Sequence, residues 1–206
     1  MPLLTGQYHI RFRNDDEDGT WMADQDVENI TISVDIPFRV RIALGCTGFG
    51  SFDFQPANLY FAVNSDTVTR VTANSSPIQS TPSMFESDGA SCVGEIDDGS
   101  GNIPDDNFIY AGTFDGDDGS ADCNVDEMGH VGPISIPSGC FTEVEYCLVI
   151  PSAGVNHGDI IELNVYKGTT PLMEYAYIPI IEVDKPPTFK PWFKSRNHLL
   201  GGGFDV

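Results

Sequence analysis

Residues 141–150 have the sequence FTEVEYCLVI, in which apolar side chains recur at every second position. Successive side chains of an extended chain point to opposite faces, so a period of two gives a strand with one apolar face. The apolar face of this segment consists of Val144, Tyr146, Leu148 and Ile150. The segment therefore predicts a β-strand with one buried side.

The same period recurs along the chain. In residues 8–13, Tyr8, Ile10 and Phe12 alternate with His9, Arg11 and Arg13, and in residues 38–42 Arg39 and Arg41 alternate with apolar side chains. Further strands are predicted at residues 30–34, 59–63, 67–71, 108–110, 160–166 and 173–183. No segment of about ten or more residues has the apolar stripe of an amphipathic helix. About ten strands in one domain need two packed sheets. The predicted fold class is all-β: a two-sheet antiparallel β-sandwich of immunoglobulin-like or jelly-roll type.

The second half of the chain predicts a local strand order. Short turns at residues 156–159 and 167–170 separate the strands predicted at 141–150, 160–166 and 173–183. Three long strands joined by short turns are typical of a meander, in which consecutive strands are neighbours in one sheet.

The chain divides into a sandwich body and an arm. Residues 1–184 carry the strand patterns, interrupted by long acidic loops at about 74–106 and 115–129 that are rich in Ser, Pro, Asp and Gly. Residues 185–206 form the second part, an extended, basic and aromatic C-terminal arm. Its three prolines at 186, 187 and 191 lack the N–H that a central strand needs.

Charge divides the chain in the same way. The net charge is −21 over 206 residues. The arm holds four cations and one anion, which is +3, so residues 1–184 carry −24. A body this acidic repels nucleic-acid phosphates and anionic lipid, and no apolar run is long enough to span a membrane. We therefore expect a protein partner, with neither nucleic acid nor membrane bound.

The arm supplies the predicted partner-binding residues. It carries aromatic and basic side chains of the types that dominate interface energies, and it begins after the last predicted strand. The residues expected to contact a partner are Phe189, Lys190, Trp192, Phe193, Lys194, Arg196 and Phe204. Insertion into a neighbouring subunit is the favoured interpretation, and folding back onto the body is the alternative.

The acidic loop is a candidate metal site. Its carboxylates would repel one another unless solvated or neutralised, and Ca²⁺ prefers oxygen ligands. The candidate ligands are Asp115, Asp117, Asp118, Asp122 and Asp126. Their spacing matches no ordered motif, so a solvated loop without cofactor stays the alternative. A second calcium-like run begins at Asn14, but its twelfth position is Gln25 where Glu is needed, which favours an acidic turn.

Nothing in the chain predicts an enzyme. No nucleophile elbow, zinc-protease motif or phosphate-binding loop is present, and the four histidines are widely spread. The five cysteines are odd in number and form no C-x-x-C pair, so buried or free thiols are expected. The sequence therefore predicts a non-enzymatic protein.

Four phrases carry a resemblance to a known group. They are the turn at 12–16 (FRNDD) followed by Thr20-Trp21, the strand at 38–41 (FRVR), the strand at 142–146 (TEVEY), and residues 175–183. Together they resemble β-sandwich virion proteins of tailed bacteriophages. The resemblance implies a capsid decoration (cement) protein on the outer surface of the head, often trimeric, that clamps neighbouring subunits. Its implied partners are the major capsid protein and copies of itself.

Two other functions fit the same sequence. A carbohydrate- or receptor-binding β-sandwich of a phage tail or cell-surface assembly, dependent on calcium, would use loops rich in Asp and aromatic residues. A sandwich-fold glycosidase or lyase would use paired carboxylates, which a chain with 31 acidic residues also contains by chance.

Overall fold

The computed structural model describes residues 4–16, 20–48, 50–53, 57–81, 108–109, 123–124, 135–137 and 141–187. Within these residues all regular structure is strand. Sheet A contains β1 (Leu4–Asn14), β3 (Phe38–Thr47), β7 (Gln79–Ser80), β11 (Phe141–Val149) and β14 (Glu174–Tyr175). Sheet B contains β2 (Asn29–Ser33), β5 (Ala57–Val63), β6 (Thr69–Arg70), β12 (Ile160–Lys167), β13 (Thr170–Pro171) and β15 (Ile180–Asp184). Two short pairs join β4 (Ser51–Asp53) to β10 (Ser135–Pro137) and β8 (Phe108–Ile109) to β9 (Cys123–Asn124).

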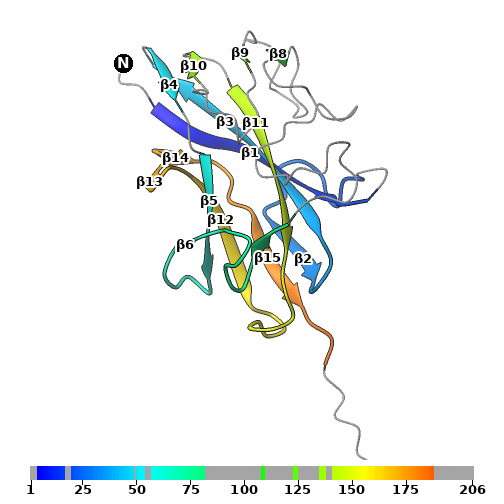
Figure 1. Cartoon of the computed structure of the whole chain (residues 1–206). Helices are drawn as coiled ribbons and strands as arrows, with labels where there is room; N and C mark the ends of the chain where they lie inside the picture. Colours follow the sequence, from blue (N-terminus) through cyan, green and yellow to red (C-terminus); the bar gives the residue numbers. More distant parts are fainter. Residues whose placement is uncertain are drawn as a thin grey trace, which may run out of the picture.

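The two sheets pack as two layers, which confirms the predicted β-sandwich (Figure 1). The strand order is β14-β1-β3-β11-β7 in sheet A and β2-β15-β12-β5-β6 in sheet B, with β13 paired to β12. Most neighbours are antiparallel, as expected, but each sheet has one parallel pair, β1 with β14 and β15 with β2. Both sheets are therefore mixed.

The alternation in sequence becomes the two faces of sheet A. Phe12, Val40 and Tyr146 occupy neighbouring positions on β1, β3 and β11, and each is at most 1% exposed. Leu163 and Ile181 of sheet B belong to the same buried cluster. The arginines of β1 and β3 occupy the opposite face, as the period of two predicts.

One position on β1 departs from the prediction. The pairing of β1 with β3 shifts between Gln7 and His9, so Tyr8 is the extra residue of a β-bulge. Gln7 therefore faces the core and is fully buried, whereas Tyr8 lies over Gly6, where an added Cβ would come within 2.9 Å of the Tyr8 ring. The prediction that Tyr8 shares the face of Ile10 is wrong, because alternation changes side at a bulge.

The predicted meander is also wrong. Strand β11 pairs with β3 and β7 in sheet A, whereas β12 lies in sheet B between β15 and β5. The strand predicted at 173–183 is divided between β14 in sheet A and β15 in sheet B. Side-chain periodicity indicates which face of a strand is buried, but it does not indicate to which sheet the strand belongs.

The loop predicted from residue 74 starts later than expected. Ile78 is fully buried in the core, and β7 pairs with β11 at residues 79–80. The acidic loop predicted at 115–129 lies outside the described residues except for two positions of β9.

Gln7 joins the two sheets where the ladder of sheet B is incomplete. Strand β15 pairs with β12 only at residues 160–162. Beyond that point, the backbone N–H of Val165 donates to Gln7 Oε1 at 3.2 Å, and Gln7 Nε2 donates to the carbonyl of Tyr177 at 2.7 Å. The hydroxyl of Tyr175 donates to the Val165 carbonyl at 2.9 Å. Two side chains of sheet A, Gln7 on β1 and Tyr175 on β14, thus satisfy the backbone of Val165 in sheet B.

Replacing Gln7 by Leu should lower the free energy of unfolding by about 2–4 kcal/mol, because the Val165 N–H and the Tyr177 carbonyl would both lose a buried partner. Urea denaturation measures the change. The matched control is Gln79→Leu on the short edge strand β7, which should change stability by less than about 0.5 kcal/mol. Equal effects of the two substitutions would show that the Gln7 amide has no special role.

Candidate functional site

Both sites predicted from sequence lie outside the described residues. These are the arm residues Phe189, Lys190, Trp192, Phe193, Lys194, Arg196 and Phe204, and the candidate ligands Asp115, Asp117, Asp118, Asp122 and Asp126. Across the described ranges, no group of three or more His, Cys, Asp or Glu side chains is placed to hold a metal ion. In the same ranges, no helix is long and apolar enough to cross a membrane. Cys46 and Cys147 are buried as thiols, which confirms the cysteine prediction for these two.

The described chain does show where the arm is attached. Strand β15 lies inside sheet B between β2 and β12 and ends at Asp184. Immediately after it, Lys185 Nζ donates to the carbonyls of Ser152 and Val155, at 2.8 and 2.7 Å. Lys185 was assigned to the arm by charge, yet its ammonium is bound to the body. The two prolines that follow, Pro186 and Pro187, are exposed.

Two aspartates shape the loop that receives Lys185. Asp159 accepts the backbone N–H of Asn156 at 2.8 Å and the side-chain amide of Asn64 at 3.2 Å. The Asn156 hydrogen bond is the largest cause that lowers the pKa of Asp159, and Asn64 and Lys185 contribute in the same direction. Asp35 accepts the backbone N–H of Ser152 at 2.8 Å, and this bond lowers the pKa of Asp35. Carboxylates thus order the loop at the root of the arm.

A second cluster gathers on the outer face of sheet A. Arg11 and Arg13 on β1 stand in register with Arg41 and Arg39 on β3. Trp21 lies beside three of these guanidinium groups, with its ring centroid 4.3 Å from Arg11 Cζ, 5.3 Å from that of Arg41 and 5.4 Å from that of Arg13. Arg41 is only 1% exposed. We call Arg11, Arg13, Arg39, Arg41 and Trp21 the arginine–tryptophan cluster.

The cluster contains a buried ion pair. Arg39 Nε donates to Asp15 Oδ1 at 2.8 Å, and the two side chains are 4% and 1% exposed. The neighbouring Asp16 accepts the backbone N–H of Thr20 at 3.2 Å, so this carboxylate closes a turn. Asp18 and Gly19 of the run beginning at Asn14 lie outside the described residues, so the choice between an acidic turn and a calcium loop stays a prediction.

Three of the four phrases behind the phage resemblance lie at or next to this cluster. The turn at 12–16, Trp21 and the strand at 38–41 supply its members, and Glu145 of β11 holds the register position opposite Arg41. Phrases separated by more than a hundred residues thus occupy neighbouring positions on three adjacent strands. The arginines of β1 and β3 hold Asp15 and Trp21 of the β1–β2 loop on sheet A.

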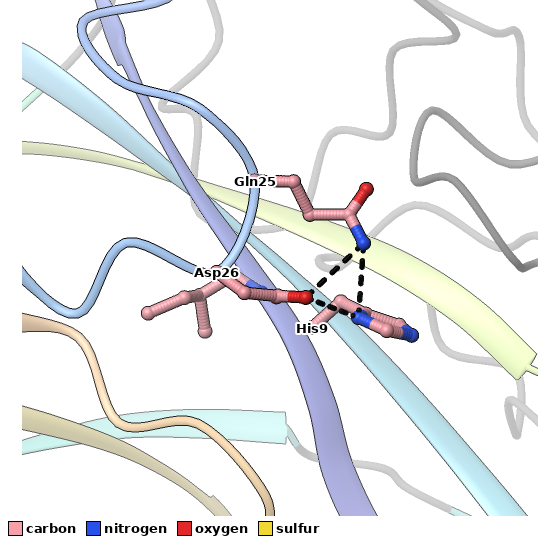
Figure 2. Close-up of polar contacts among 4 residues, drawn as sticks. His9, Gln25 and Asp26 are labelled. Atoms are coloured by element: carbon pink, nitrogen blue, oxygen red, sulfur yellow. Dashed lines mark hydrogen bonds and ion pairs between the residues drawn. The ribbon is translucent and has the colours of Figure 1, made fainter.

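His9 makes a separate polar contact with the end of that loop. Figure 2 shows the His9 ring beside the Asp26 carboxylate, with the Gln25 amide above them. His9 Nδ1 lies 2.9 Å from Asp26 Oδ2 and 3.2 Å from Gln25 Nε2, and the tautomer of the ring decides with which of the two it forms a hydrogen bond. Gln25 Nε2 donates to the same oxygen at 3.1 Å, and Ile10 N–H donates to Asp26 Oδ1 at 3.1 Å.

This arrangement is suited to anchoring. Asp26 has a φ of 62°, a left-handed conformation that Asp tolerates better than most residues, and its own N–H donates to the Ile10 carbonyl at 2.9 Å. A histidine oriented by an aspartate also occurs in proton-transfer sites. Here the same carboxylate holds a backbone N–H and Gln25, so its described contacts fasten the loop to β1. Nothing in the sequence signals that residues 9 and 26 meet, so this contact could not be predicted.

A small cavity opens between the sheets. Asn58, Arg70, Ser80 and Tyr146 are among the residues that line it, and its volume is about 30 Å³. That volume holds a water molecule or two and no sugar ring.

No protein-family model, no curated protein and no solved structure matches this chain. Its function must therefore be inferred from its own residues.

The carboxylates of the loop at the root of the arm should make the free energy of unfolding decrease at acid pH. A carboxyl group whose pKa is lower in the folded state stabilises the protein above its unfolded pKa, near 4, and this stabilisation is lost as pH falls through the folded value. We expect the urea concentration at the unfolding midpoint to decrease when the pH is lowered below about 4. The decrease should be smaller in Asp159→Asn than in the wild type. Identical pH profiles for Asp159→Asn and the wild type would contradict the assignment.

The buried pair predicts strong coupling between two residues. Arg39→Met should cost about 3–5 kcal/mol, because it leaves the Asp15 carboxylate buried without its guanidinium. The double variant Asp15→Leu/Arg39→Met should lose clearly less than the sum of the two single variants in a denaturation cycle. Arg70→Met, at an exposed arginine on β6, is the control and should stay within about 0.5 kcal/mol. Additive single effects would show that the pair is not coupled.

Proposed function

We propose that this protein is a non-enzymatic virion structural protein, a capsid decoration (cement) protein that clamps neighbouring capsid subunits from outside the head. Its partners would be the major capsid protein and further copies of itself. The observation that carries the proposal is the position of β15. It lies inside sheet B with β2 on one side and β12 on the other, so the residues after Asp184 have no place beside β15.

The attachment of the arm supports a role in holding a neighbour. Lys185 binds two carbonyls of the body, which fixes the point from which the chain leaves. Pro186 and Pro187 restrict the backbone just beyond it. An arm with a fixed origin loses less conformational freedom on binding than one that starts from a loose terminus.

Charge supports the same role. The body carries −24, so identical bodies repel one another at the close distances of a shell. A basic, aromatic arm offers each copy a way to bind an acidic surface, with aromatic side chains as anchors. Many such contacts on one shell would together strengthen the attachment of the protein through multivalency.

The polar contacts of the body support a structural protein. The described carboxylates of Asp15, Asp26 and Asp159 each accept hydrogen bonds that order a loop or pair with a buried cation. These groups are committed to holding loops in place. A carbohydrate-binding role is the competing function, and the experiment below separates the two.

A variant that ends at Pro187 tests the proposal, because it retains every described contact of Lys185. It should unfold at the wild-type temperature yet bind shells assembled from the phage's major capsid protein at least about tenfold more weakly, as measured by co-sedimentation. The control is Asp205→Asn, which removes no cation and no aromatic side chain from the arm.

Full attachment of the shortened chain to the shell would contradict the proposal. Calcium-dependent binding to a glycan array that survives the truncation would favour the carbohydrate-binding alternative.

A further inference from the structure

Of the four strands that stand first or last in the two main sheets, β2 is the longest. Among the described edge strands, β14 and β7 of sheet A and β6 of sheet B have two residues each. Strand β2, at the other edge of sheet B, has five. Short edges offer little backbone for another strand to pair with, whereas a five-residue edge is a template for one.

The backbone groups on the outer edge of β2 can be identified. Val34 N–H donates to the Asp184 carbonyl, and Ile180 N–H donates to the Glu28 carbonyl, so the even-numbered residues of this segment bond to β15. In a strand the bonding direction alternates, so the N–H and C=O groups of Asn29, Thr31 and Ser33 point away from β15. Asn29 and Thr31 are exposed. Within the described ranges, no backbone hydrogen bond reaches these three residues from beyond the edge.

Such an edge binds an extended segment by adding it as a further strand. The arm contains a segment with the required backbone. Residues 192–200 (WFKSRNHLL) are nine residues without proline, more than the five that β2 presents, and every one has a backbone N–H. The prolines of the arm all precede this segment.

The charges of the segment and the edge are complementary. Lys194 and Arg196 are two apart, so an extended chain places them on one face. On β15, Glu182 and Asp184 stand in register with Thr31 and Ser33 of β2. A strand added to β2 would put its side chains about 10 Å from those of β15, within reach of long basic side chains.

We propose that residues 192–200 of a neighbouring copy add to the outer edge of β2 and extend sheet B from one copy into the next. This rests on the proposed function and names the surface that the arm binds. The neighbouring copy is favoured over the arm's own body by where the chain leaves. Asp184 pairs with Ser33 at the end of β2, and Figure 1 shows residues 185–187 running beyond the ends of both strands.

Hydrogen exchange on the full-length protein tests the pairing without any substitution. On self-association, followed by analytical ultracentrifugation over a range of concentrations, the amides of Asn29, Thr31 and Ser33 should become at least about tenfold more protected. Protection that is already complete in the monomer would mean that the arm pairs with its own body, and it would overturn the inference. An assembled state in which these amides stay unprotected, or a chain that remains monomeric throughout, would also overturn it.

A proline on the edge gives a second test. Thr31→Pro removes one outward-pointing N–H and leaves the bonds of β2 to β15 in place, because the Thr31 N–H does not face β15. The full-length variant should lose self-association at least about tenfold while keeping its fold by circular dichroism. The matched control Thr31→Val keeps the N–H and should associate like the wild type. Wild-type association of a folded Thr31→Pro protein would contradict the inference.

The two proposals fail separately. If Thr31→Pro associates normally but removal of residues 188–206 still releases the protein from shells, the arm binds elsewhere and the decoration role stands. If the truncated chain attaches to shells as the full chain does, the decoration role itself is wrong, whatever the exchange pattern at β2.

Discussion

The sandwich depends on the backbone of β12 finding partners after β15 has ended. Strand β15 covers only the first residues of β12, and an unpaired buried N–H or carbonyl costs free energy comparable to a lost hydrogen bond. The amide of Gln7 and the hydroxyl of Tyr175, both in sheet A, supply these hydrogen bonds to Val165. The same amide holds the Tyr177 carbonyl, in the connection that carries the chain from sheet A to sheet B. One buried glutamine therefore fixes both the spacing of the layers and the crossing between them.

The two faces of sheet A are stabilised by different physics. The inner face is a continuous apolar core. The outer face carries four arginines, of which Arg39 and Arg41 are almost fully buried, so their charges need partners. Asp15 and the Trp21 ring are among those partners, and both belong to the β1–β2 loop. These contacts with buried charges hold the β1–β2 loop in one position. The contact of Asp26 with His9 fastens the same loop near its other end.

The sequence was sufficient for the strands and their buried faces, and insufficient for their assembly. A period of two identified β3, β11 and β12, because burial of one face is a local property of the side chains. It could not place β11 and β12 in different sheets or divide residues 173–183, since sheet membership is decided by contacts distant in sequence. The bulge at Tyr8 has no sequence signal of its own. Among the candidate sites, Arg39 and Asp15 were visible as charged residues, but only the register of β1 with β3 brings them together.

The parallel pairing of β2 with β15 has a consequence for how the protein is made. The partner of β2 is β15, which is synthesised about 150 residues later, and Gln7 reaches a partner 170 positions further along the chain. Contacts of such long sequence separation form slowly. A nascent chain therefore cannot close its sandwich until β15 has been synthesised, and a chain that stops before Asp184 lacks the strand that β2 pairs with.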